Sequence, residues 1–244
     1  MPDSHPTLRL LLVGHGRMGR AIEALCNEHG FEVAGRLDAS CNAGGAGIDE
    51  RWSDVDVAVD FSVGAAVADN LRRLAGLGID TVIGTTGWHQ AESELRALTA
   101  ASSIGVVAAP NCAPGVNAFI AIVERAAALL SRADATAGFE PWVHELHHAR
   151  KIDAPSGTAI VLREALAKGG FDPRLAIAST RAGSIPGTHT VGFDGPFETV
   201  TLTHTTRDRR VFAQGALEAA RWVHGRRGWF TMRDVLGIDQ EGLT

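Results

Sequence analysis

Short apolar runs alternate with longer segments of helical period through the first half of this chain, and this alternation constrains its fold more than any other feature. The runs are rich in β-branched and other apolar residues, as expected of buried strands. Strands are predicted over residues 8–13, 31–37, 55–61, 80–83 and 105–108, with helices over 17–29, 65–77 and 90–101. The pattern predicts a parallel sheet with right-handed crossovers.

The alternation of short strand-like runs and helical segments ends after Pro110. A long apolar helix is predicted over 116–130, followed by strand-like runs around Val143 and over 176–179, 189–193 and 198–204. This mixture predicts a second, α+β domain. A last helix over 211–223 and the tail WFTMRDVLGI follow, and the pattern alone leaves open which domain they contact.

Composition excludes several classes of function. The net charge of −5 argues against nucleic acid or an anionic membrane as partner, because both favour a basic surface. No apolar run of about 18 residues is evident, and the first apolar run is too short for a secretory signal. The three cysteines form no C-x-x-C pair, which favours a reducing cytoplasm over a disulfide framework or a cysteine zinc site. The chain contains no tyrosine, so a tyrosine general acid is excluded.

A glycine-rich turn, Gly14-His15-Gly16-Arg17-Met18-Gly19, lies between the first predicted strand and helix. It matches G-x-G-x-x-G, in which glycines let the backbone approach a pyrophosphate at a helix N-terminus. Asp38 ends the second strand, where a carboxylate accepts hydrogen bonds from ribose hydroxyls. The alternatives are a structural turn and a solvated loop aspartate, but the position after a first strand favours dinucleotide binding.

Two further loops end predicted strands. Thr85-Thr86-Gly87 follows the fourth strand, and residues 109–112 follow the fifth. Ligands of open α/β sheets bind at such carboxyl ends, although either loop could be a plain turn.

The segment His144-Glu145-Leu146-His147-His148 formally matches the zinc motif H-E-x-x-H. That motif requires a helix, whereas the preceding residues Pro141 to Val143 are typical of a strand. No metal is therefore expected, and a structural histidine cluster remains an alternative. We favour His147 and Lys151 as catalytic residues, because a spacing of four places them on one side of a strand or a helix. Histidine donates protons near neutral pH, and lysine attracts anions.

The next segment, Asp153-Ala154-Pro155-Ser156-Gly157-Thr158-Ala159, precedes an apolar helical run. Ser156 is a candidate N-cap. The helix start at Gly157 and Thr158 would present free N–H groups to an anion such as a carboxylate, although an ordinary capped helix explains the pattern as well.

The run E-x-H-H-x-x-K-x-D-A-P-S-G-T-A over residues 145–159 resembles the signature of the dihydrodipicolinate reductase family. The resemblance extends to G-R-M-G at 16–19, G-T-T-G at 84–87, P-N at 110–111, G-V-N at 115–117, R-A-G at 181–183 and M-R-D-V-L at 232–236. It implies NAD(P)H-dependent reduction of 4-hydroxy-tetrahydrodipicolinate, a small dicarboxylate, in diaminopimelate and lysine biosynthesis. It also implies a Rossmann domain, expected over 1–112, and an α+β substrate and tetramerisation domain over 113–215. The segment 216–244 is expected to pack back on the Rossmann domain.

By the same resemblance, His147 is the general acid/base and Lys151 a proton donor, while His148, Gly157 and Thr158 bind substrate carboxylates. The dinucleotide is expected to contact Gly14, His15, Gly16, Arg17, Met18, Asp38, Gly84, Thr85, Thr86, Ala109, Pro110, Asn111 and Cys112.

The chain departs from the family at Cys112-Ala113-Pro114, where many members carry an aromatic residue or methionine and then serine. Asp38 is followed by Ala39 rather than by arginine, which favours NADH over NADPH. Arg36 shares a strand face with Asp38, so the two are expected to pair and to leave some NADPH use. Two other functions are compatible with the fold: another two-domain reductase such as an amino-acid dehydrogenase, and a non-catalytic dinucleotide sensor.

Overall fold

The structure is a computed structural model that describes residues 6–239, apart from the side chains of residues 133–137. The chain divides into two compact units, unit 1 comprising Met1–Pro114 with Arg210–Thr244 and unit 2 comprising Gly115–Arg209. The second predicted boundary, at residue 215, differs from this division because it falls inside helix α6 (Arg210–Val223). All of α6 belongs to unit 1, where Ala213, Ala216 and Ala220 are buried in the core.

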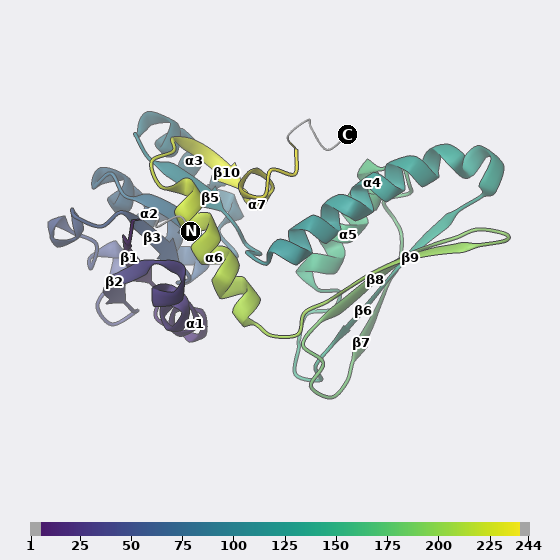
Figure 1. Cartoon of the computed structure of the whole chain (residues 1–244), viewed down its shortest axis with the longest axis horizontal. Helices are drawn as coiled ribbons and strands as arrows, with labels where there is room; N and C mark the ends of the chain where they lie inside the picture. The colour runs from purple at the N-terminus through teal and green to yellow at the C-terminus, as the bar shows by residue number, and fades with distance from the viewer. Residues whose placement is uncertain (1–5, 240–244) are drawn as a thin grey trace. The chain divides into compact units, whose positions relative to one another are not determined.

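Unit 1 is built on a six-stranded parallel sheet with the order β10-β5-β4-β3-β1-β2 (Figure 1). Its strands are β1 (Leu8–Val13), β2 (Phe31–Leu37), β3 (Val57–Asp60), β4 (Asp80–Ile83), β5 (Gly105–Ala108) and β10 (Gly228–Thr231). The predicted Rossmann-type fold is confirmed. Strand β3 is shorter than expected because the N–H of Val55 donates to the Trp52 carbonyl in a turn, outside the ladder.

Helices cover both faces of this sheet (Figure 1). They are α1 (Arg17–Cys26), α2 (Gly64–Gly76), α3 (Glu92–Ala101), α6 and the short α7 (Met232–Val235), with 3₁₀ turns at Asn27–His29, Ala43–Gly45, Glu50–Trp52 and His89–Ala91. Strand β1 shows why two layers form. Leu10 and Leu12 pack against Ile22 of α1, whereas Leu11 and Val13 lie in a second core with Leu74 of α2. A strand that is apolar on both sides is stable only when both faces are covered.

Unit 2 is a four-stranded mixed sheet with the order β7-β6-β8-β9. Strand β6 (Glu140–His147) pairs in parallel with β7 (Ile177–Arg181) and antiparallel with β8 (Thr188–Asp194), which pairs antiparallel with β9 (Thr199–Thr205). Helices α4 (Pro114–Ala137) and α5 (Gly157–Lys168) pack on the sheet through a core that includes Val123, Leu162 and Phe193. On β6, buried and less buried residues alternate, so Glu145 and His147 point to the same side as buried Val143.

Helix α4 corrects one sequence expectation. By length and composition alone, its stretch Pro114–Arg132 would suffice to cross a membrane. Phe119, Val123 and Ala127 of this stretch are buried in the unit 2 core, while 22% of the stretch is buried in all. A single helix of this length and composition is weak evidence for a membrane span.

Candidate active site

A pocket of about 490 Å³ opens at the carboxyl edge of the unit 1 sheet. It lies beside the ends of β1 and β3, adjacent strands whose connections leave in opposite directions, which is where open α/β sheets bind ligands. The lining residues come from the loops after β1, β2 and β3 and from the start of α2: Gly14, His15, Gly16, Leu37, Asp38, Ala39, Asn42, Ala43, Gly44, Phe61, Ser62, Val63 and Ala66.

The glycines of the predicted phosphate turn are required by its geometry. Gly14 has a φ of +93°, and a Cβ there would collide with the Phe61 backbone. A Cβ on Gly19 would collide with the Gly14 carbonyl, so this glycine lets α1 approach the turn. Gly16 caps α1 without a side-chain hydrogen bond, and Arg17 and Met18 form the first turn of the helix. No side chain therefore caps the N-terminus of α1 by a hydrogen bond, which fits a site for an anionic pyrophosphate.

Asp38 lines the same pocket and is exposed. The hydrogen bonds that it accepts from Ser40 and Cys41 end on Oδ1. These bonds, led by the one from the Ser40 hydroxyl, hold the pKa of Asp38 below its usual value, which favours the carboxylate form.

Arg36 does not fulfil the predicted pairing with Asp38. Its guanidinium forms an ion pair with Glu23 of α1, and Glu23 also lies 2.6 Å from Nε2 of His15. The side chain of Arg36 thus turns to the neighbouring helix, where a carboxylate is close, and strand periodicity could not reveal this partner.

The other predicted cofactor residues follow β4 and β5 at the same sheet edge. Gly84 and Thr85 donate their N–H groups to the Asp60 carbonyl, and Thr86 is exposed. Ala109 and Cys112 are buried. Burial raises the pKa of the Cys112 thiol to about 12, which makes it an inert packing residue. Pro110 and Asn111 are more exposed and lie between these two.

The H-E-x-x-H segment is part of strand β6, so the helix that a zinc protease motif needs does not form. Nε2 of His144 instead lies 2.9 Å from the Thr180 hydroxyl on β7.

The predicted catalytic residues lie at the end of β6 and in the turn that follows. His147 is buried, and the N–H of Lys151 donates to the His148 carbonyl in the turn that follows. Burial is the main cause that lowers the pKa of His147; Glu145 opposes this effect, and Lys151 adds to it. The Lys151 ammonium forms hydrogen bonds of 2.7 and 2.8 Å with Asp153, a partner that sequence reasoning missed.

Helix α5 begins at Gly157, as predicted, and Ser156 is its N-cap, accepting a hydrogen bond from the Ala159 N–H. The N–H groups of the first helical turn have no partner within a helix, so Gly157 and Thr158 can donate to an anion. His148, between β6 and this helix, has a buried Nδ1 without a hydrogen-bond partner among the described residues.

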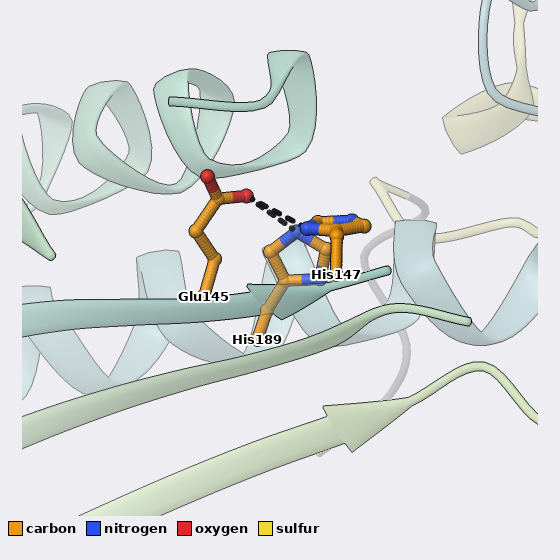
Figure 2. Close-up of side chains that lie close together, drawn as sticks. All are labelled: Glu145, His147 and His189. Atoms are coloured by element: carbon orange, nitrogen blue, oxygen red, sulfur yellow. Dashed lines mark ion pairs between the residues drawn. The ribbon is translucent and has the colours of Figure 1, made fainter. Parts of the chain in front are cut away.

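Sequence reasoning missed the group that connects these parts. Glu145 of β6 and His189 of β8 lie beside His147 (Figure 2), and Arg181 of the neighbouring strand β7 forms an ion pair with Glu145. Donor atoms of Glu145, His147 and His189 lie within 4.8 Å of one another, so the three could hold a metal ion by distance. However, the Arg181 guanidinium lies 2.8 Å from Glu145, which disfavours a second cation there. One signal was present in the sequence: Glu145 and His147 are two residues apart, the period of one strand face.

Comparisons with known proteins agree with this architecture. Residues 8–112 match the family model "Dihydrodipicolinate reductase, N-terminus", and residues 115–236 match "Dihydrodipicolinate reductase, C-terminus". The chain is 36% identical to the 4-hydroxy-tetrahydrodipicolinate reductase of Bradyrhizobium diazoefficiens and 38% identical to that of Acidiphilium cryptum, and each match covers 95% of this chain and 98% of the relative.

Solved structures share the fold. A dipicolinate-bound dihydrodipicolinate reductase from a Paenisporosarcina species has a TM-score of 0.74 at 21% identity, covering 92% of this chain and 97% of that one. An amine dehydrogenase from Mycobacterium smegmatis has a TM-score of 0.54 at 12% identity, covering 93% and 95%. At these identities the structures show a common fold and nothing more.

Proposed function

The chain belongs to the dihydrodipicolinate reductase family, and from this premise we propose that unit 1 binds the nicotinamide dinucleotide and unit 2 binds the substrate. The chain is an NAD(P)H-dependent oxidoreductase that reduces 4-hydroxy-tetrahydrodipicolinate in diaminopimelate and lysine biosynthesis. The observation that carries the division of roles is the grouping of His147, Lys151 and the α5 N-terminus in unit 2, away in sequence from the glycine-rich pocket of unit 1.

The reaction consumes 4-hydroxy-tetrahydrodipicolinate, NAD(P)H and a proton and yields tetrahydrodipicolinate, NAD(P)⁺ and water. Loss of water leaves a ring in which a C=C bond is conjugated with C=N. When bound, the nicotinamide supplies the hydride that adds to the β-carbon of this system. The protein must then hold two carboxylates and deliver a proton to the developing enamine.

The substrate dianion would be held by cationic and N–H donors of unit 2. The free N–H groups of Gly157 and Thr158 and the side chain of His148 would bind its carboxylates, and Lys151 would add positive charge and act as a proton donor. His147 would serve as the general acid/base. Orientation of the ring by these groups lowers the entropic cost of reaching the transition state.

The dinucleotide would lie along the carboxyl edge of the unit 1 sheet. Support comes from the glycine-rich turn at Gly14 to Met18, where no side chain caps α1 by a hydrogen bond. Asp38, whose pKa is lowered, lines the same pocket. The loops over 84–86 and 109–112 would contact it as well. We propose a preference for NADH with some NADPH use, because Asp38 repels a 2′-phosphate while Arg17, the first residue of α1, follows the phosphate turn.

We also propose a cytoplasmic homotetramer. The family resemblance supports this assembly, as does the sheet of unit 2, whose strand β9 alternates exposed and half-buried residues and whose strand β6 carries Trp142, a large apolar residue that is 37% exposed. Light scattering after size-exclusion chromatography measures the assembly directly.

The test of the function is NADH oxidation with enzymatically generated 4-hydroxy-tetrahydrodipicolinate. We expect oxidation that depends on this substrate, with tetrahydrodipicolinate as the product. Oxidation with a 2-oxo acid and ammonia instead would identify an amino-acid dehydrogenase, and NADH binding without turnover would identify a sensor.

A further inference from the structure

Glu145 is a buried carboxylate on the same strand face as His147, with 0% of its side chain exposed. Figure 2 shows its carboxylate pointing at the His147 ring, with His189 reaching the same place from β8. A buried carboxylate is costly unless its charge is compensated, so the partners of each oxygen are informative.

The two oxygens of Glu145 have different partners. Oε1 accepts hydrogen bonds from the Ser156 N–H at 3.0 Å, the Ser179 hydroxyl at 2.7 Å and the Arg181 guanidinium at 2.8 Å. Oε2 lies 3.2 Å from Nδ1 of His147 and 3.8 Å from Nε2 of His189, so His147 is its nearer neighbour. Within the described part of the chain neither Oε2 nor that Nδ1 has another hydrogen-bond partner, and each is therefore the nearest polar group available to the other.

The opposite edge of the imidazole faces glycine. Gly187 has a φ of +148°, and a Cβ there would lie 3.2 Å from Nε2 of His147. A side chain at position 187 would therefore crowd Nε2, and glycine leaves this edge of the ring free of side-chain atoms from that position.

We propose that Glu145 is a positioning residue for His147: it keeps the proton on Nδ1, turns Nε2 towards the substrate and stabilises the imidazolium form that donates the proton. This inference rests on the proposed role of His147 as general acid/base, and it adds the residue that orients the imidazole and fixes the position of its proton. A carboxylate that holds the far nitrogen of a histidine fixes its tautomer and ring orientation.

The other groups around His147 do not replace Glu145 in this task. Lys151 and Arg181 are cationic and oppose an imidazolium, and Asp153, which favours one, is engaged by the Lys151 ammonium. His189 packs edge-on against His147 with ring centroids 5.1 Å apart. Burial, with the charge of His147 next, lowers the pKa of His189 to about 4, so it stays neutral.

The same carboxylate also holds the proposed anion site. Ser156 donates its N–H to Glu145 and caps α5, and its hydroxyl lies 3.2 Å from Nε2 of His189. Glu145 therefore fixes the proton donor and the helix start relative to each other within unit 2.

The decisive variant is Glu145→Gln. Three donors point at the Oε1 position, so the amide oxygen must remain there and the amide NH₂ must face Nδ1 of His147. Nδ1 then accepts a hydrogen bond from this amide, and His147 carries its proton on Nε2. The imidazolium form is disfavoured, because a second proton on Nδ1 would point at the amide NH₂, which is also a donor. We expect kcat to fall by about 10²- to 10³-fold with an unchanged Kd for NADH, since general acid catalysis of this kind is worth about 10²- to 10⁴-fold.

The readout that a merely structural role would not change is the tautomer of His147. ¹⁵N NMR, with the His147 signal assigned by its loss in His147→Gln, should show Nδ1–H in the native protein and Nε2–H in Glu145→Gln. The matched control is Ser179→Ala, which removes one donor to Oε1 but keeps the carboxylate; it should retain Nδ1–H and kcat within about threefold. Glu145→Asp, which keeps the charge on a shorter side chain, should keep Nδ1–H and lose less activity than the glutamine variant.

Either measurement, kcat or the tautomer of His147, can overturn the proposal. A glutamine variant that keeps kcat, or that loses kcat while its His147 remains Nδ1–H, removes Glu145 from this role. An Nε2–H tautomer in the native protein overturns it without any variant. The NMR result is independent of turnover, so inactivity of the native protein on 4-hydroxy-tetrahydrodipicolinate would count against the proposed function alone.

Discussion

Replacing Glu145 with glutamine should make unit 2 less sensitive to acid. Burial works to raise the pKa of Glu145, but hydrogen bonds from Ser156, Arg181 and Ser179 outweigh it and lower the pKa from 4.5 to about 2. A carboxyl whose pKa is lower in the folded state stabilises the fold above its unfolded pKa, and the contribution is lost as the pH falls through the folded pKa. The window for Glu145 therefore runs from pH 4.5 down to about 2.

The expected loss between pH 4.5 and pH 3 is about 1 to 2 kcal/mol of unfolding free energy, at about 1.4 kcal/mol per pKa unit and allowing for solvent screening near the strand end. Hydrogen exchange of β6 peptides in urea, measured across this interval, reports on unit 2 alone. Over this interval the unfolding free energy of the native protein should fall further than that of Glu145→Gln, and the difference should equal this amount. His189 loses its neutral-form stabilisation mainly between pH 6.5 and its pKa of about 4, which lies for the most part above the interval measured.

Asp172→Asn is the matched control. The pKa of Asp172 is also lowered to about 2, by hydrogen bonds from Arg174, but this pair is exposed and only two residues apart. Such a local contact persists in the unfolded chain, so its removal should change the acid sensitivity little. Equal losses in the native protein and Glu145→Gln would refute the reasoning.

Three further predictions follow from the proposed site. Lys151→Ala and His147→Gln should each lower kcat by about 10²-fold or more while leaving Kd for NADH nearly unchanged. If either variant keeps the native turnover, the residue that it replaces is not catalytic. Chelation should leave reductase activity unchanged, and one tightly bound zinc per chain that is lost together with activity would contradict this. The native protein should favour NADH over NADPH by about ten-fold in kcat/KM, and Asp38→Ala should reduce that ratio; an NADPH preference, or an unchanged ratio, would show that Asp38 does not set cofactor choice.

The local elements and the family signature could be predicted from the amino-acid sequence. Strands β1, β2, β4 and β5 have the predicted bounds, because runs of apolar β-branched residues leave few other ways to be buried. The positive φ of Gly14 and the Ser156 cap of α5 were also foreseeable, since each depends on neighbours within a few residues.

Which side chains meet depends on the order and register of strands that are distant in sequence. Strand β10 returns to pair with β5 across more than half of the chain, and Arg36 finds Glu23 rather than Asp38. Glu145 and Arg181 meet because β6 and β7 are parallel neighbours, and His189 joins them because β8 flanks β6 on the other side. Periodicity reports the face of a strand on which a residue lies, whereas its partner depends on sheet order and register, which are set by packing between segments distant in sequence.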